Sequence, residues 1–344
     1  MSEQSQLEQA KAIHADALVL DAHADVASAS TSPRFLTEHG RSRVDPELMR
    51  EGGVDAVILS LAAGPGPRTP TGYAAARKSV GEKLTLVRDL IDESAGAIVH
   101  AKTVNELLAA KSENKIAIML GFQNALILGE DPSGIEEFYR FGARVFALTH
   151  MGHNDFADSS RPLKVTAMGW DEPVEEHGGL SDLGKEAIRL IDKIGGVVDI
   201  SQLSTAAALQ AIKLSKRPVI ASHSNVRGVS NATRNVTDKV LDEIAHNGGV
   251  VHVAAFLAFL VPSEDKERHK KITEARGRAG LDREFVLYPM EGYWNIKDED
   301  VSAQFVADMG DILSDFYAVY FVRCGYAAGS QSYGQQAQQQ SGTS

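Results

Sequence analysis

The stretch "LSDLGKEAIRLIDKIGGVVDIS", residues 180–201, contains a helix pattern and a strand pattern in direct succession. Ser181 is a suitable N-cap, and apolar residues recur behind it at helical spacing. The run that follows, residues 197–201, is almost continuously apolar, as expected for a strand that is covered on both faces. This stretch predicts one helix–strand unit of an α/β protein.

Similar units recur on both sides of this stretch. Six more apolar runs read as strands, at residues 19–23, 54–61, 116–122, 145–150, 219–224 and 250–256. Repeated strand–helix units favour a parallel barrel or a doubly wound sheet. No glycine-rich phosphate loop follows the first strand, which disfavours a dinucleotide-binding sheet. Polar residues cluster at the ends of several strands, so we predict a TIM-type (β/α)8 barrel that is incomplete at its last strand.

The barrel is expected to occupy residues 1–316. The segment "YAVYFVR", residues 317–323, could serve as an eighth strand, but it has no polar residue placed for chemistry. The end of the chain is rich in Gln, Ser and Gly. We therefore predict that residues 317–344 form a divergent and largely disordered tail.

Composition narrows the classes of function. The chain has 344 residues, a formal net charge of -11 and 43% hydrophobic residues, so it can bury a sizeable core but is a poor partner for nucleic acid. The single cysteine, Cys324, excludes an internal disulfide and a cysteine-rich metal site. We see neither a signal-peptide pattern nor an apolar run near the ~18 residues that span a bilayer. We therefore expect a cytoplasmic protein without a membrane span.

The first strand ends on a histidine and an aspartate two residues apart, His23 and Asp25, whose side chains point to the same side of a strand. Other polar residues at strand ends or in the loops beyond are Gln123, Asn124, His150, His153, Asn154, Asp155, Asp158, Asp199, Gln202, His223 and Arg234. One histidine at a strand end is more often structural than a ligand, but several such ends converging on one barrel mouth favour a zinc hydrolase. Histidines elsewhere, among them His100 and His177, are expected to be solvated in helices or loops.

Three stretches around these polar residues resemble the sequence of a known protein family. "DAHADV", "LTHMGHNDFADS" and "RPVIASHSNVRGVSNATRNV" together resemble the membrane (renal) dipeptidase family, over residues 17–256. The resemblance implies a (β/α)8 barrel of the amidohydrolase type that hydrolyses dipeptides and tolerates a D-residue on the C-terminal side. It also implies two zinc ions bridged by a glutamate, with a bridging hydroxide that attacks the scissile carbonyl.

The resemblance assigns roles to individual residues. His23 and Asp25 match ligands of the first metal ion, and His223 matches a ligand of the second. His150 matches the histidine that contacts the substrate and stabilises the tetrahedral oxyanion. Arg234 matches the arginine that binds the substrate carboxylate, a sensible role for a guanidinium fork.

Three departures from the family weaken the second metal site. The bridging glutamate falls on Gln123 and a second-metal histidine falls on Gln202, so each position offers a neutral amide oxygen, a weak ligand. A "GSDFDG" motif after the last strand is missing, and the similar "LSDF" closes a helical pattern, so Asp315 is not assigned its role. We expect the reading frame to diverge from the family after about Phe316, through truncation or a frameshift.

The leading interpretation is a zinc-dependent dipeptidase of reduced activity, with one clear zinc site and a doubtful second one. Two alternatives stay open. The chain could be a catalytically impaired barrel that binds peptides or a partner protein at the same mouth. It could also be a one-metal amidohydrolase of another small amide, with Gln123 and Gln202 as substrate contacts. The resemblance also makes a homodimer plausible.

Overall fold

The computed structural model describes residues 3–26, 46–165, 170–254, 256 and 259. The chain divides into two compact units, Met1–Arg217 and Pro218–Ser344. The predicted tail, Asp315 and the candidate eighth strand lie outside the described residues. Within the described residues, no helix is both long enough and apolar enough to cross a membrane.

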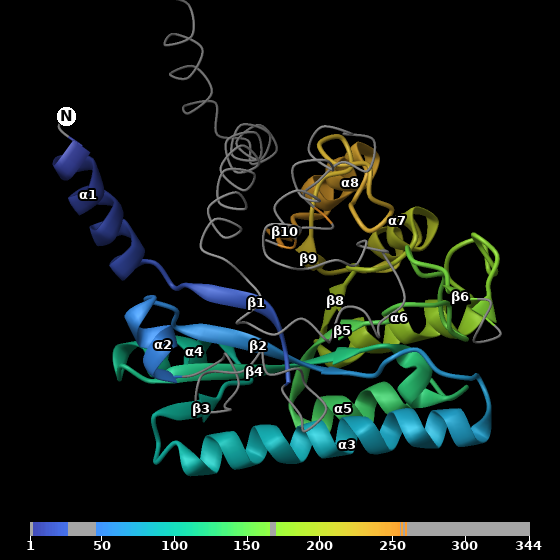
Figure 1. Cartoon of the computed structure of the whole chain (residues 1–344), viewed down its shortest axis with the longest axis horizontal. Helices are drawn as coiled ribbons and strands as arrows, with labels where there is room; N and C mark the ends of the chain where they lie inside the picture. Colours follow the sequence, from blue (N-terminus) through green and yellow to red (C-terminus); the bar gives the residue numbers. More distant parts are fainter. Residues whose placement is uncertain (1–2, 27–45, 166–169, 255, 257–258, 260–344) are drawn as a thin grey trace, which may run out of the picture. The chain divides into compact units, whose positions relative to one another are not determined.

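The first unit is built on a parallel sheet (Figure 1). Its strands lie in the order β1 (Leu20–Asp25), β2 (Ala56–Ala62), β4 (Ile116–Gln123), β5 (Ala143–Ala147) and β8 (Val197–Asp199). In the register of this sheet Gln123 pairs with Ala147, and Ala147 pairs with Asp199. The polar ends of β4 and β8 therefore stand at the same level of the sheet, on either side of β5.

Helices precede and follow these strands in the alternation that the sequence predicts. They are α1 (Glu3–Asp16), α2 (Pro46–Glu51), α3 (Pro70–Glu93), α4 (Val104–Ser112), α5 (Gly134–Phe141), α6 (Asp182–Ile194) and α7 (Thr205–Leu214). The predicted N-cap of α6 is confirmed, because Ser181 Oγ accepts the N–H of Gly184 at 3.1 Å. Figure 1 shows α3 and α5 running along one face of the sheet.

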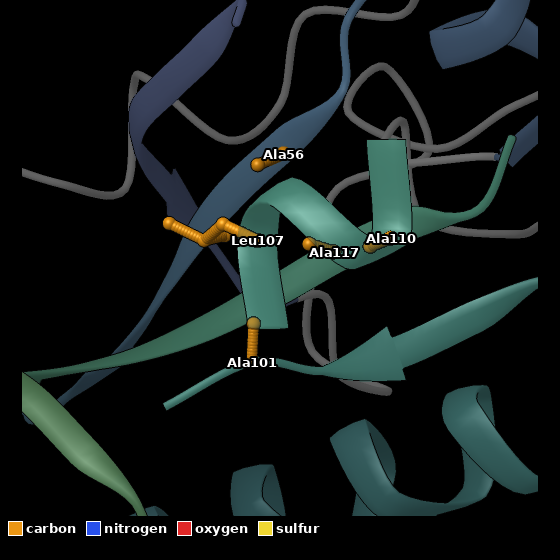
Figure 2. Close-up of a cluster of buried hydrophobic side chains, with 5 residues drawn as sticks. All are labelled: Ala56, Ala101, Leu107, Ala110 and Ala117. Atoms are coloured by element: carbon orange, nitrogen blue, oxygen red, sulfur yellow. The ribbon is translucent and has the colours of Figure 1, made fainter. Parts of the chain in front are cut away.

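Small side chains let one helix approach the sheet closely. Strand β2 is buried along its whole length, as its continuous apolar run predicts. A cluster of Ala56, Ala101, Leu107, Ala110 and Ala117 joins α4 to β2 and β4 (Figure 2). Four of these five side chains are single methyl groups, so α4 can pack against the strands without leaving a void.

The second unit contains a further strand–helix–strand unit. β9 (Ile220–Ser224) and β10 (Val250–Val253) pair in parallel, and α8 (Asp238–Asn247) connects them. Thr237 is the N-cap of α8, as the sequence predicts, and Gly248 ends the helix in a left-handed conformation, with φ +77°.

All seven predicted strands are present in the described part of the chain, and three short ones were not predicted. β3 (Ile98–His100) pairs with the start of β4, and β6 (Lys164–Val165) pairs antiparallel with β7 (Trp170–Asp171). β6 and β7 have only two residues each, too few to show a pattern. The expectation of a solvated His100 is wrong, because this residue ends β3 half-buried, and burial is the main cause that lowers its pKa.

Candidate metal centre

The end of β1 carries the predicted pair of metal ligands. His23 Nε2 lies 3.9 Å from Asp25 Oδ1. The imidazole is mostly buried, with 14% of its side chain exposed, whereas the Asp25 carboxylate is 73% exposed. The strand thus presents one nitrogen and one carboxylate ligand in the same neighbourhood, as the His-x-Asp spacing predicts.

A second carboxylate reaches His23 from β8. Asp199 is buried, and one of its oxygens lies within 4.8 Å of a ring nitrogen of His23. Its carboxylate also accepts the backbone N–H of Ser201 at 2.9 Å. The sequence marked Asp199 as a polar strand end, but neither its spacing nor the family resemblance assigned it as a ligand. No local pattern in the sequence brings Asp199 to His23, because β1 and β8 are far apart along the chain.

Gln123 stands where the resemblance places a bridging glutamate. The residue is 1% exposed, and Ser60 Oγ donates a hydrogen bond to its Oε1 at 3.3 Å. Its Nε2 has no hydrogen-bond partner within the part of the chain that the structure describes. The position therefore offers a buried N–H donor in addition to a neutral oxygen, and no negative charge.

Gln202 follows β8 in a left-handed conformation, with φ +70°. Such a backbone is uncommon for a residue with a side chain, and it is kept only where the surroundings hold it in place. Gln202 is 3% exposed, and Arg161 Nη2 donates a hydrogen bond to its Oε1. The oxygen that would bind a metal ion thus faces a guanidinium group.

The loop after β5 contains His150, His153 and Asp158, which have different surroundings. His150 holds the loop through its carbonyl oxygen, which accepts the hydroxyl of Ser159 at 2.7 Å. His153 Nδ1 accepts the N–H of Ser159 at 2.9 Å, so Nε2 carries the proton and donates to the carbonyl oxygen of Pro173 at 2.9 Å. His153 is therefore a buried residue that holds the loop in place.

Asp158 anchors the segment before α6. Its fully buried carboxylate accepts the backbone N–H groups of Glu176, His177 and Gly179. Burial alone would raise the pKa of Asp158, but these N–H groups outweigh it and hold the pKa below its usual value. The expectation of a solvated His177 is also wrong, since its Nε2 lies 2.8 Å from the carbonyl oxygen of Asn154 and its side chain is 19% exposed.

In the second unit, the residues assigned to metal and carboxylate binding are neighbours. His223 lies on β9, and its Nδ1 is 2.7 Å from Ser222 Oγ. Arg234 is buried; it donates to the carbonyl oxygen of His223 and, at 2.8 Å, to Ser224 Oγ. The ring of Phe259 lies 4.9 Å from the guanidinium carbon. These contacts fix the guanidinium beside the backbone of His223.

Comparison with known proteins decides the family. The profile of the membrane dipeptidase family, peptidase family M19, matches residues 7–298. The chain belongs to this family. The resemblance inferred from the sequence is therefore confirmed.

Curated relatives match part of their length. The chain is 31% identical over 169 residues to Dipeptidase verJ of Clonostachys rogersoniana, which covers 49% of this chain and 41% of that protein. It is 26% identical over 227 residues to Dipeptidase aclJ of Aspergillus oryzae, which covers 64% of this chain and 51% of that protein. The chain thus spans about half the length of the curated relatives it matches.

Solved structures confirm the predicted fold class. The probable dipeptidase PvdM from Pseudomonas aeruginosa has a TM-score of 0.71 and 27% identity, over 92% of this chain and 80% of that chain. A metallo peptidase from Rhodobacter sphaeroides, liganded with a phosphinate mimic of the dipeptide L-Ala-D-Ala, has a TM-score of 0.56 and 19% identity, over 71% of this chain and 75% of that chain. The second likeness shows the fold alone. The chain therefore has the α/β fold of an incomplete TIM-type barrel.

Proposed function

We propose that this chain is a zinc-dependent dipeptidase whose site holds one metal ion through His23, Asp25 and Asp199. The family resemblance assigns His223 as a further metal ligand. The observation that carries the proposal is the pair formed by His23 and Asp199. In a chain of the M19 family, an imidazole nitrogen and a carboxylate oxygen from two separate strand ends lie within 4.8 Å of each other. Such a pair can share one cation, because zinc binds each ligand atom at about 2.0–2.2 Å.

The donor set fits one zinc ion. Imidazoles and carboxylates that leave an open position are the usual ligands of a catalytic zinc. When bound, the ion would act as a Lewis acid toward water and toward the substrate carbonyl. The amides of Gln123 and Gln202 do not make a second such set, because neither carries charge and each has an oxygen that already accepts a hydrogen bond from the protein.

Arg234 would select the length of the substrate. Its guanidinium fork suits a carboxylate, and its bonds to Ser224 and to the carbonyl oxygen of His223 hold it in one place. A carboxylate bound there would lie beside the metal histidine. A dipeptide has its terminal carboxylate one residue from the scissile bond, so it can satisfy both contacts, whereas a longer peptide places the carboxylate too far away.

His150 would contact the oxygen of the scissile carbonyl, the role that the family resemblance assigns to it. No residue is assigned to move the proton, because the sequence has no match to the "GSDFDG" motif. A missing acid–base group typically lowers a rate by ~10²–10⁴. We therefore propose slow turnover by comparison with a family member that has the full set. The homodimer and the cytoplasmic location expected from the sequence stay predictions.

The test is a panel of dipeptides with an L- or D-residue on the C-terminal side, measured with and without added zinc. We expect zinc to stimulate hydrolysis of the free dipeptides, and we expect the same dipeptides with an amidated C-terminus to be poor substrates. Arg234→Lys should raise KM for the free dipeptides more than for the amides, while Arg189→Gln, on the exposed face of α6, serves as the matched charge control. No hydrolysis of any dipeptide at saturating zinc, with peptide binding retained, would replace the proposal by a peptide-binding barrel.

A further inference from the structure

We propose that the guanidinium of Arg161 takes the place of a second metal ion in this chain. It limits the site to one zinc and contacts the substrate at the scissile carbonyl oxygen. This inference rests on the proposed function for its catalytic part and on the contacts of Arg161 and Gln202 for its metal part.

Arg161 is held against Gln202 by the loops that carry the two residues. Ser160 donates its backbone N–H to the carbonyl oxygen of Gln202 at 2.8 Å, and Ser159 forms an isolated β-bridge with Leu203. The hydrogen bond from Arg161 Nη2 to Gln202 Oε1 joins the side chains of the same two loops. The two loops therefore place Arg161 beside Gln202 through their backbones.

The conformation of Gln202 fixes its half of the contact. Its positive φ belongs to the left-handed region, and its side chain is buried. The hydrogen bonds to its own carbonyl oxygen hold this backbone from the side of the Arg161 loop. A strained backbone held in this way is found most often where a side chain has a functional position.

The guanidinium cation of Arg161 already contacts Gln202, the position at which the resemblance places a ligand of the second metal ion. A metal ion at Gln202 would need the lone pairs of Oε1, and the N–H group of Arg161 points at that oxygen. The ion would also lie next to a permanent positive charge, and like charges repel strongly in a buried site of low dielectric constant.

Gln123 supports the same conclusion independently. Where the resemblance expects a bridging carboxylate, the buried Nε2 of Gln123 is an N–H donor without a partner in the described structure. Without a carboxylate at this position, no negative charge is available to bind a second metal ion. A substrate oxygen, in contrast, could accept a hydrogen bond from Gln123 Nε2. Both glutamine positions therefore favour hydrogen-bond donation over a second metal ion.

Arg161 can do part of the work of a second Lewis acid. A donor aimed at an oxygen that gains negative charge in the transition state typically contributes ~10²–10³ in rate. A guanidinium is permanently charged, so it needs no proton or ion from solution. This contact strengthens as the oxyanion forms, so its loss should appear in kcat rather than in KM.

The metal part is tested in the Gln123→Glu/Gln202→His variant, which restores the two family ligands. Zinc binding is measured by equilibrium dialysis with elemental analysis, in this variant and in versions that add Arg161→Gln or Arg161→Lys. We expect the second zinc ion to bind at least about 10-fold more tightly when Gln removes the cation, and not when Lys keeps it. Equal second-site affinities in all three would overturn the proposal, whether or not the chain hydrolyses dipeptides.

The catalytic part is tested in the otherwise unchanged chain. Arg161→Gln should lower kcat about 100-fold, with the affinity for the single zinc and KM little changed, and Arg161→Lys should recover part of the loss. Circular dichroism checks that both variants fold, and Arg189→Gln controls for net charge. An unchanged kcat in folded Arg161→Gln would overturn the substrate contact.

Discussion

Two aspartates near strand ends of the first unit have opposite surroundings. The Asp158 carboxylate is fully buried and accepts three backbone N–H groups. The Asp25 carboxylate is 73% exposed, with the His23 imidazole 3.9 Å away. A buried carboxylate with its acceptor sites filled serves the scaffold, whereas an exposed one next to an imidazole remains available to a ligand. The difference separates the residues that hold the site in place from those that act in it.

The scaffold aspartate also positions the loop that carries Arg161. The backbone oxygen of Asp158 accepts the N–H of Ser204 at 2.8 Å, and its side chain anchors residues 176–179. Asp158 therefore joins the loop after β5 to the loop after β8. The contact between Arg161 and Gln202 depends on the same two loops.

The largest expected effect is on stability. Asp158→Asn removes the negative charge of a buried side chain and leaves only one acceptor oxygen for three backbone N–H groups, so we expect the free energy of unfolding to fall by about 3 kcal/mol. Urea titration followed by circular dichroism measures the change in the absence of metal. Asp92→Asn, on the exposed face of α3, is the matched control and should change stability by less than about 0.5 kcal/mol. If both variants lose the same amount, Asp158 does not hold the scaffold.

Asp25→Asn should reduce zinc affinity and leave stability unchanged, the opposite of what is expected for Asp158→Asn. The variant should lose about 100-fold or more in zinc affinity, the upper end of what is lost when a partner of a metal ligand is changed. Its urea midpoint without metal should match that of the unchanged chain, because an exposed carboxylate contributes little to folding. Competition with a zinc-binding dye measures the affinity. An affinity within threefold of the unchanged chain would remove Asp25 from the ligand set.

The pH dependence of stability sharpens the comparison. The pKa of Asp158 is lower in the folded chain than in the unfolded one, so its contribution is present at neutral pH and is lost as the pH falls below about 4 toward the folded value. The difference in urea midpoint between the unchanged chain and Asp158→Asn should therefore be large at pH 7 and shrink toward pH 3. A constant difference across this range would show that the charge of Asp158 is not what stabilises the loop.

The smallest effect is expected at the N-cap of α6. Ser181→Ala removes the acceptor for Gly184 N–H and should cost about 1 kcal/mol of stability. Zinc affinity should stay the same, because Ser181 belongs to the scaffold. A calorimetric titration of the folded variant with zinc measures this affinity. A zinc affinity that falls together with stability would contradict the claim that Ser181 supports only the scaffold.

The sequence predicted the strands that are covered on both faces, because β2 and β4 show nearly continuous apolar runs. It also predicted the pair at the end of β1 and the family to which the chain belongs. It did not predict β3, because only two apolar residues of that strand precede its histidine, whereas β8 lies within a longer run, residues 197–201. The contact between Arg161 and Gln202 joins residues 41 positions apart through side-chain directions, which no local pattern encodes. Asp199 was visible as a strand end, but its nearness to His23 depends on how the strands are arranged in space.

The central claim is that His23, together with the carboxylates at strand ends of the first unit, binds the zinc ion. X-ray absorption at the zinc edge, on protein loaded with one equivalent of zinc, counts the imidazole ligands directly. The account predicts an imidazole ligand in the unchanged chain and one imidazole fewer in the variant His23→Ala. A spectrum with no imidazole, or one that stays the same when His23 is removed, would contradict it.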